Sequence, residues 1–280
     1  MGVLFLNAKQ KAMKVLSSKT FLFAVLGSLV LVGCKQQRLD NDTTASENEA
    51  FIQANERAFE NDIEESTRSV LVNDQCNPLN YLNDCVEVTD SGEGVYPREI
   101  ILDYGDGCLG QGGRIRYGQI IINLSDDMGV EGATRTVTFQ DFAVNNTYIE
   151  GTRVAISQGT NGEGQPQWTR TVDMTFTRNG NELGRNFNQD VTWLSGYNTE
   201  ECGDNVFQIS GSGSVTRPNG NVVTRTIISP LIVDKVCGYT VQGVIVVDAP
   251  LGQRTLDFGD GSCDDDAIVI IDGEEFPIDL

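Results

Sequence analysis

The sequence predicts an all-β protein: an elongated antiparallel meander, folded as a sandwich or a curled sheet, preceded by one N-terminal acidic helix. From about residue 86 onward, short runs rich in Val, Ile, Thr, Tyr and Phe recur roughly every ten positions between turn residues. Asn-Gly or Asp-Gly pairs at 161–162, 179–180, 219–220 and 272–273 supply the positive φ angles of tight hairpins. No break in composition divides this part, so residues 73–280 are assigned to one β domain.

The residues expected to form strands alternate between apolar and polar side chains or form short β-branched and aromatic runs. Ten or more strands are expected, and good examples are Ile100–Asp103, Ile115–Asn123, Thr134–Phe142, Tyr148–Ile156, Trp168–Thr177, Val206–Val215, Val222–Ile228, Val236–Val247 and Ala267–Ile271.

The N-terminus has the pattern of a lipoprotein signal peptide over residues 1–33. Four lysines precede an apolar run, Phe21–Val32, which is shorter than the roughly 20 residues that a membrane-spanning helix needs. The run ends in Gly33-Cys34, a small residue before a cysteine. We therefore expect Cys34 to carry acyl chains, among them palmitate. These chains would anchor the protein in the membrane. An ordinary secretory signal with an incidental cysteine is the alternative.

The expected mature chain is strongly acidic. Removal of residues 1–33 takes away four lysines and no acidic residue, which leaves 16 basic against 40 acidic groups and a formal charge of −24. Apart from Lys35 and Lys235, the basic residues are arginines scattered singly. This charge argues against nucleic acid as a partner and favours divalent cations or basic partners, although it equally serves solubility.

Two segments are expected between the anchor and the sheet. Residues 35–45 are polar and lack large apolar residues apart from Leu39, so residues 34–45 are predicted to form a flexible tether. Residues 46–72 read as an amphipathic acidic helix, with a Ser-x-x-Glu capping box at Ser46 and helical spacing of the apolar residues Ile52, Phe59, Ile63 and Val70. We expect the apolar stripe to dock on the β domain; a free stalk is the alternative.

Six cysteines follow Cys34 and predict up to three disulfides. They are Cys76, Cys85, Cys108, Cys202, Cys237 and Cys263. Proximity in sequence favours the pair Cys76 and Cys85, and the partners of the other four stay open. The spacing does not match that of a structural zinc site.

The chain contains no histidine, which excludes Ser-His-Asp and Cys-His catalysis and histidine-ligated metals. Carboxylate chemistry remains, and Asp106 with Asp260 is the candidate pair for glycoside cleavage. We expect a protein that is not an enzyme.

A weak internal repeat links residues 101–108 and 254–263. In both, an apolar strand runs into Asp-aromatic-Gly-Asp-Gly and then a cysteine. We interpret it as a strand-turn-strand unit used twice, in which glycine permits the turn and cysteine fixes it. Residues 105–110 also match Gly-x-Gly-x-x-Gly, but a strand follows where a dinucleotide site needs a helix.

The second copy of the repeat is a candidate calcium site. Its possible oxygen ligands are Asp257, Asp260, Asp264, Asp265 and Asp266, although their spacing departs from that of an EF-hand. Asp103 and Asp106 would form a poorer second site.

Five aromatic residues could offer a sugar-stacking surface, although aromatic residues inside strands more commonly belong to a core. They are Trp168, Trp193, Tyr104, Tyr148 and Tyr197.

Several motifs together resemble those of uncharacterised outer-membrane lipoproteins of the Bacteroidota. They are the cysteine motif at residues 31–34, the acidic helix, and residues 103–108, 118–122, 148–153, 191–196 and 257–264. The resemblance implies an outer-membrane location and an all-β fold, with no activity or site residues. Lys35 to Arg38 depart from the acidic residues with which many lipoproteins of that phylum reach the surface, so the periplasmic and surface faces both stay open.

These observations predict a lipid-anchored cell-envelope protein, a non-enzymatic β module that binds or scaffolds an envelope protein, a glycan or a lipid. Two alternatives remain: a lipid or glycolipid carrier whose sheet curls round an acyl chain, and a carboxylate-dependent glycan-active enzyme.

Overall fold

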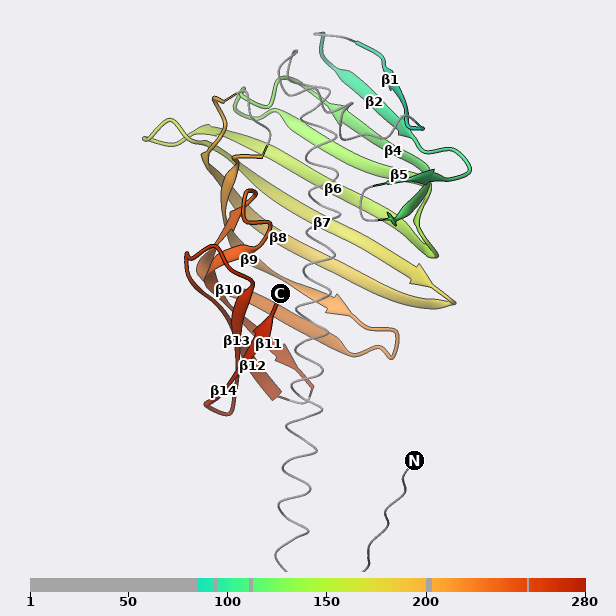
Figure 1. Cartoon of the computed structure of the whole chain (residues 1–280). Helices are drawn as coiled ribbons and strands as arrows, with labels where there is room; N and C mark the ends of the chain where they lie inside the picture. The colour runs from blue at the N-terminus through green and yellow to red at the C-terminus, as the bar shows by residue number, and fades with distance from the viewer. Residues whose placement is uncertain (1–84, 93–94, 111–112, 200–202, 251) are drawn as a thin grey trace, which may run out of the picture. The chain divides into compact units, whose positions relative to one another are not determined.

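The computed structural model describes residues 85–92, 95–110, 113–199, 203–250 and 252–280. These residues form fourteen strands of one antiparallel meander, which confirms the expected all-β fold (Figure 1). The predicted signal peptide, Cys34, tether and acidic helix lie outside the described residues. Within the described ranges, no helix has the length and hydrophobicity needed to cross a membrane.

Each strand pairs with its neighbours in the chain, in the order β1-β2-β4 and onward to β14, and β3 pairs with β4 beside this path. The strands are β1 Glu87–Asp90, β2 Arg98–Asp103, β3 Cys108–Leu109, β4 Ile115–Leu124, β5 Thr134–Val144, β6 Thr147–Thr160, β7 Pro166–Arg178, β8 Asn181–Ser195, β9 Val206–Thr216, β10 Val222–Asp234, β11 Thr240–Ala249, β12 Gly252–Asp260, β13 Asp266–Ile271 and β14 Glu274–Asp279.

The expected strands are present, but several of their boundaries differ, since β6 continues to Thr160 and β10 to Asp234. The sequence patterns single out no strand over β8, because its outward-facing residues include Asn186, Asn188 and Asp190, which have low β propensity. The strand expected from Val236 begins instead at Thr240. Residues 235–239 form a turn in which the carboxylate of Asp234 accepts a hydrogen bond from the Val236 amide at 2.8 Å.

Two of the four expected hairpin turns have the conformation that their sequences predict. Asn179-Gly180 has φ angles of 52° and 76°, and Asp272-Gly273 has 52° and 82°. Asn161-Gly162 and Asn219-Gly220 do not, because the positive φ angles lie at Gly164 and at Gly220 alone. In the first of these loops, the Asn161 side chain accepts hydrogen bonds from the amides of Glu163 and Gln165.

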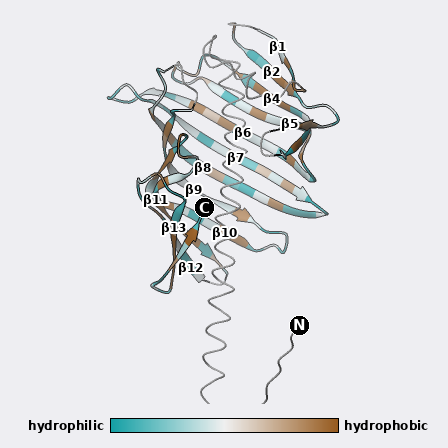
Figure 2. Ribbon diagram, viewed as in Figure 1, coloured by the Kyte–Doolittle hydropathy of each residue, from teal (hydrophilic) through white to brown (hydrophobic). Residues whose placement is uncertain are grey.

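The two faces of the sheet differ in character, and Figure 2 shows hydrophobic and hydrophilic residues interleaved along the strands. We call the face that carries the buried side chains the inward face. Its apolar residues form one cluster over β2 to β9, with Ile100, Leu102 and Val172, and a second over β10 to β14, with Phe258 and Val269. The opposite, outward face is more polar and exposed.

The inward face also carries one buried arginine on each of eight strands. They are Arg98, Arg116, Arg135, Arg153, Arg170, Arg185, Arg225 and Arg254. Strand register aligns them in rows across the sheet: Arg98, Leu124, Arg135, Ala155 and Arg170 form one. A second row runs from Arg153 through Phe187 and Arg225 to Arg254. Arginines that are scattered singly in the sequence thus gather on one side.

Some of these guanidinium groups have neighbours on the sheet itself. Arg98 forms an ion pair with Asp90. The Arg98 hydrogen bond holds the pKa of the Asp90 carboxyl below its usual value. Arg170 donates to the side-chain oxygen of Gln189 at 2.9 Å. The Arg185 guanidinium lies 4.7 Å from the centre of the Phe187 ring, a cation–π distance.

Candidate functional site

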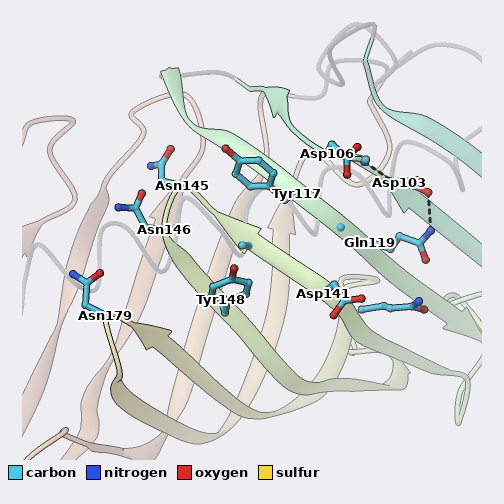
Figure 3. A pocket seen from close by; sticks show the side chains of 13 residues that line it. Asp103, Asp106, Tyr117, Gln119, Asp141, Asn145, Asn146, Tyr148 and Asn179 are labelled. Carbon is cyan, nitrogen blue, oxygen red and sulfur yellow. Dashed lines mark hydrogen bonds between the residues drawn. The ribbon is translucent and has the colours of Figure 1, made fainter.

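A surface hollow of about 870 Å³ lies on the outward face, over β2, β4, β5 and β6 and beside the turn between β7 and β8 (Figure 3). Its position on that face follows from the strand alternation. Asp103 pairs with Gln119, and Gln119 pairs with Gln140, whereas the adjacent Leu102 and Ile120 are buried on the inward face. The lining combines carboxylate and amide side chains with two tyrosines.

A local irregularity in β4 and β5 shapes this hollow. Gly118 has a φ of 68°, and a Cβ atom there would lie 2.3 Å from the carbonyl oxygen of Asp141. Asp141 itself has a φ of 50°. The pairing of β4 with β5 shifts between Tyr117 and Gln119, as a β-bulge does. The close approach of the two backbones therefore requires glycine at position 118.

Asp103 is a fixed anion at one side of the hollow. One of its oxygens accepts a hydrogen bond from the Gly105 amide at 2.8 Å, and the other accepts one from the Gln119 side chain at 2.6 Å. The Gly105 amide first, and Gln119 second, hold the pKa of Asp103 below its usual value. The carboxylate is therefore ionised and oriented before any ligand arrives.

Tyr117 and Tyr148 supply the apolar part of the hollow. Both pair with Ala143, which lies between them on β5, so their backbones are about 10 Å apart, two strand spacings. Tyr148 is 60% exposed, whereas Ala143 is buried. Asn145, Asn146 and Asn179 surround the same end of the hollow (Figure 3).

This arrangement suits a neutral, polyhydroxylated ligand. Carboxylates accept hydrogen bonds from hydroxyl groups, side-chain amides both donate and accept them, and tyrosine rings provide flat apolar surfaces. The described lining contains Asp103, Asp106 and Asp141 and no lysine or arginine, so an anionic ligand would be repelled.

Of the five aromatic residues that could offer a sugar-stacking surface, only Tyr148 lines the hollow. Tyr104 is buried in the first apolar cluster. Trp168 and Trp193 instead pack on Phe207, with ring centres 6.1 Å and 5.6 Å apart. Tyr197 packs against Trp193 at 6.1 Å.

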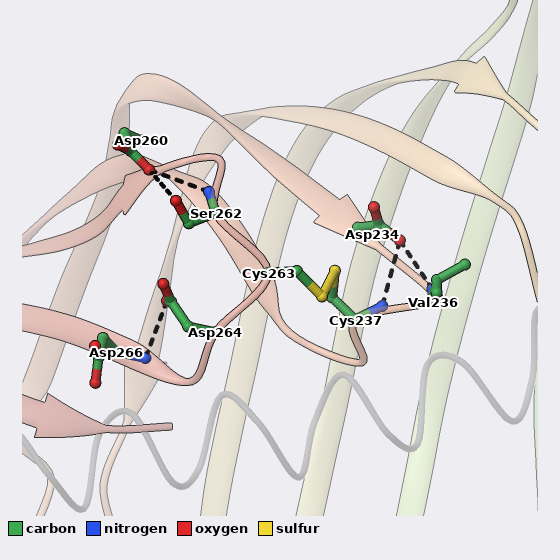
Figure 4. Close-up of a disulfide and its surroundings, with 8 residues drawn as sticks. All are labelled: Asp234, Val236, Cys237, Asp260, Ser262, Cys263, Asp264 and Asp266. Carbon is green, nitrogen blue, oxygen red and sulfur yellow. Dashed lines mark hydrogen bonds between the residues drawn. A yellow bond between two sulfur atoms is a disulfide. The ribbon is translucent and has the colours of Figure 1, made fainter.

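Both copies of the repeat end in a disulfide-bonded cysteine, as its interpretation as a fixed turn predicts. Cys108 bonds to Cys85. Cys263 bonds to Cys237, and Figure 4 shows this second disulfide. The expected pair of Cys76 with Cys85 is wrong, because β1 pairs with β2 and brings Cys85 close to the turn that follows β2. Cys76 and Cys202 lie outside the described residues.

The two copies also share their turn contacts and their burial. Asp257 accepts a hydrogen bond from the Gly259 amide at 3.0 Å, as Asp103 does from Gly105. The aromatic residues that follow these aspartates, Tyr104 and Phe258, are each buried in one of the two apolar clusters.

Two of the candidate calcium ligands, Asp260 and Asp264, accept hydrogen bonds from residues of the turn in which they lie. Asp260 accepts hydrogen bonds from the hydroxyl and the amide of Ser262, at 2.7 Å and 3.1 Å, and these bonds lower its pKa. Asp264 accepts from the Asp266 amide at 3.3 Å (Figure 4). Over the described ranges, no three Cys, Asp or Glu side chains are grouped as metal ligands. Calcium at Asp257 to Asp266, or at Asp103 and Asp106, stays an untested prediction.

The candidate glycosidase pair is not brought together by neighbouring strands. Asp106 lies in the turn after β2, and Asp260 ends β12, nine strand steps along the sheet. Glycoside cleavage needs two carboxyl groups roughly 5–10 Å apart. Of the two, only Asp106 lines the hollow.

The sequence patterns missed most of the hollow. Tyr117 and Gln119 are outward-facing residues of a strand that was expected, so alternation alone could have placed them together. Gln140, Asp141 and the asparagines come from later strands and turns, and only the strand pairing brings them to the same place. No family model, curated protein or solved structure matches this chain. The fold and the hollow define a class: a one-sheet antiparallel meander with a polar, acidic surface site.

Proposed function

We propose that this protein is a lipid-anchored, non-enzymatic binding module of the cell envelope, and that its outward hollow binds a neutral glycan. The observation that carries the proposal is the presence in one hollow of two tyrosines together with carboxylate and amide groups, of which Asp103 and Gln119 hold each other by a hydrogen bond. Outer-membrane attachment through Cys34 completes the proposal and rests on the sequence motif at residues 31–34.

The chemistry of the hollow supports a sugar over other ligands. Aromatic residues combined with a few placed polar groups are typical of sites that orient a small ligand. The ordered carboxylate of Asp103 can accept hydrogen bonds from two hydroxyl groups, and side-chain amides can both donate and accept. The negative charge of the lining disfavours phosphorylated or acidic ligands.

The disulfides support an exported protein. Disulfides persist in oxidising compartments and are rare in the cytosol. Cys85–Cys108 closes the turn that carries Gly105 and Asp106, so it also holds one wall of the hollow.

Calorimetric titration of the full chain in detergent with neutral oligosaccharides tests the glycan proposal. We expect binding, and we expect Tyr148→Ala and Tyr117→Ala each to weaken it by about five- to thirtyfold, the effect of losing about 1–2 kcal/mol of ring contact. Ile228→Ala is the matched control, because Ile228 is 61% exposed and does not line the hollow. Oligosaccharide binding that both tyrosine variants retain, or no binding at millimolar concentration, would refute the proposal.

The anchor is tested separately. Radiolabelled palmitate should be incorporated into the protein and lost in Cys34→Ser, which should then leave the membrane fraction. A Cys34→Ser variant that still sediments with membranes contradicts the anchor without touching glycan binding.

A further inference from the structure

The inward face is buried although the described residues form a single layer. All fourteen strands belong to one sheet, and no helix or second sheet of the described ranges lies over this face. Even so, Ile100, Leu102 and Phe142 are almost inaccessible to solvent, and Arg153 is only 2% exposed. A sheet buries one of its faces either by closing on itself or against a second layer, and β1 and β14 are the two unpaired ends of the strand order over the described ranges, which leaves the second layer.

The chemistry of the face restricts what the second layer can be. It combines two apolar clusters with eight buried guanidinium groups. Arginine stays protonated in proteins, and buried charges are stable beside counter-charges and hydrogen-bond acceptors. The complementary layer is therefore amphipathic and anionic.

The segment 46–72 of the same chain has this character. It contains seven acidic residues and two arginines around the apolar residues Ile52, Phe59, Ile63 and Val70. With 3.6 residues per turn, Glu49, Glu56 and Glu60 lie within about a quarter turn of the apolar stripe. Asp62 lies within the same range on the opposite flank of the stripe, and Glu47, Glu64 and Glu65 lie more than about a quarter turn from it. Four carboxylates would thus approach the sheet together with the apolar residues.

The dimensions also agree. A helix over residues 47–68 would be about 33 Å long. Along the sheet, Arg98 and Arg170 are four strand steps apart, about 19 Å, and Arg153 and Arg254 are six, about 29 Å. Thirteen residue steps connect Val72 to Cys85, at most about 45 Å of extended chain, so the segment is tethered close to the face at a high effective concentration.

We infer that residues 46–72 dock as a helix on the inward face, with the apolar stripe over the two clusters and Glu49, Glu56 and Glu60 among the buried arginines. The segment that follows the lipid tether is then the second layer of the fold. The occupant of the arginine-bearing face is part of this chain, so the face is not a free site for an anionic lipid or a second copy.

Charge-neutral variants of the full chain in detergent test this inference through thermal unfolding. The combined variant Glu49→Gln, Glu56→Gln and Glu60→Gln should lower the melting temperature by about 10 °C, because buried guanidinium groups would lose their counter-charges. The matched variant Glu47→Gln, Glu64→Gln and Glu65→Gln should change it by less than about 2 °C, as exposed charges do. Equal shifts in the two variants would overturn the inference.

Photo-cross-linking identifies the occupant directly. With p-benzoylphenylalanine in place of Phe59, irradiation should link this position to inward-face residues of the same chain, whereas the same group in place of Ala58, on the other side of the helix, should not. A cross-link between two chains, a cross-link to co-purified lipid, or the absence of any cross-link from position 59 would each overturn the proposal. Glycan binding plays no part in this readout, so the two proposals fail separately.

Discussion

The requirement for glycine at position 118 gives the sharpest test of how the hollow is built. In Gly118→Ala, the new methyl group would lie 2.3 Å from the carbonyl oxygen and 2.5 Å from the carbonyl carbon of Asp141. Both are backbone atoms, so β5 must shift. The positive φ lowers the free energy of unfolding of the alanine variant by about 1 kcal/mol. The clash lowers it by about a further 2 kcal/mol or more. We expect a total loss of about 3 kcal/mol, or about 10 °C in melting temperature for a domain of this size.

Gly132→Ala is the matched control for this prediction. Gly132 has a comparable φ of 84°, but a Cβ atom there would meet no atom within 4 Å. The free energy of unfolding of Gly132→Ala should therefore fall only by the cost of a positive φ angle for alanine, about 1 kcal/mol. Urea unfolding followed by circular dichroism measures both variants, and glycan titration should show weaker binding for Gly118→Ala alone. Equal losses of stability in the two variants would refute the close-contact reasoning.

Three further predictions concern the rest of the sheet. Because the Arg98 bond lowers the pKa of Asp90 in the folded state, its stabilisation should be complete above the ordinary carboxyl pKa of about 4 and should be lost as the pH falls through the lowered folded-state pKa. Acid unfolding curves should show less acid sensitivity in Asp90→Asn, and equal sensitivity would contradict the assignment. Replacing Cys237 and Cys263 together by serine should cost about 2–4 kcal/mol of stability in urea, whereas an unchanged midpoint would mean that the bond is absent in solution. Because Asp260 binds its own turn, millimolar calcium should leave the melting temperature as it is in chelator, and a rise that Asp260→Asn abolishes would establish a site.

The repeat shows how far a local pattern can predict a structure. The residues of Asp-aromatic-Gly-Asp-Gly-Cys stabilise the turn among themselves. The side chain of the first aspartate accepts a hydrogen bond from the backbone amide two residues later. The glycines at 105, 107, 259 and 261 adopt positive φ angles. These contacts span only a few residues, so they were predictable. The partners of Cys108 and Cys263 lie 23 and 26 residues away. Sequence proximity pointed to Cys76 for Cys85 and was wrong, because strand pairing decides which cysteines meet.

The hollow was only partly predictable for the same reason. Asp103, Asp106 and Tyr148 were candidate binding residues, but they were assigned to separate sites for calcium, catalysis and sugar stacking. The structure gathers them with Tyr117 and Gln119, which no motif marks. The calcium and catalytic roles had been inferred from residue type, and residue type does not report where a side chain lies in the sheet.

The sequence by itself determined the strand content, because the two-residue alternation of apolar and polar side chains is a local property that each strand carries alone. It also carried the net acidic charge and the absence of histidine. Only the tertiary structure decided that eight isolated arginines share one face, that two tyrosines and several amides share the other, and which cysteines pair. Those relations depend on register between strands, and register is set by contacts between residues far apart in the chain.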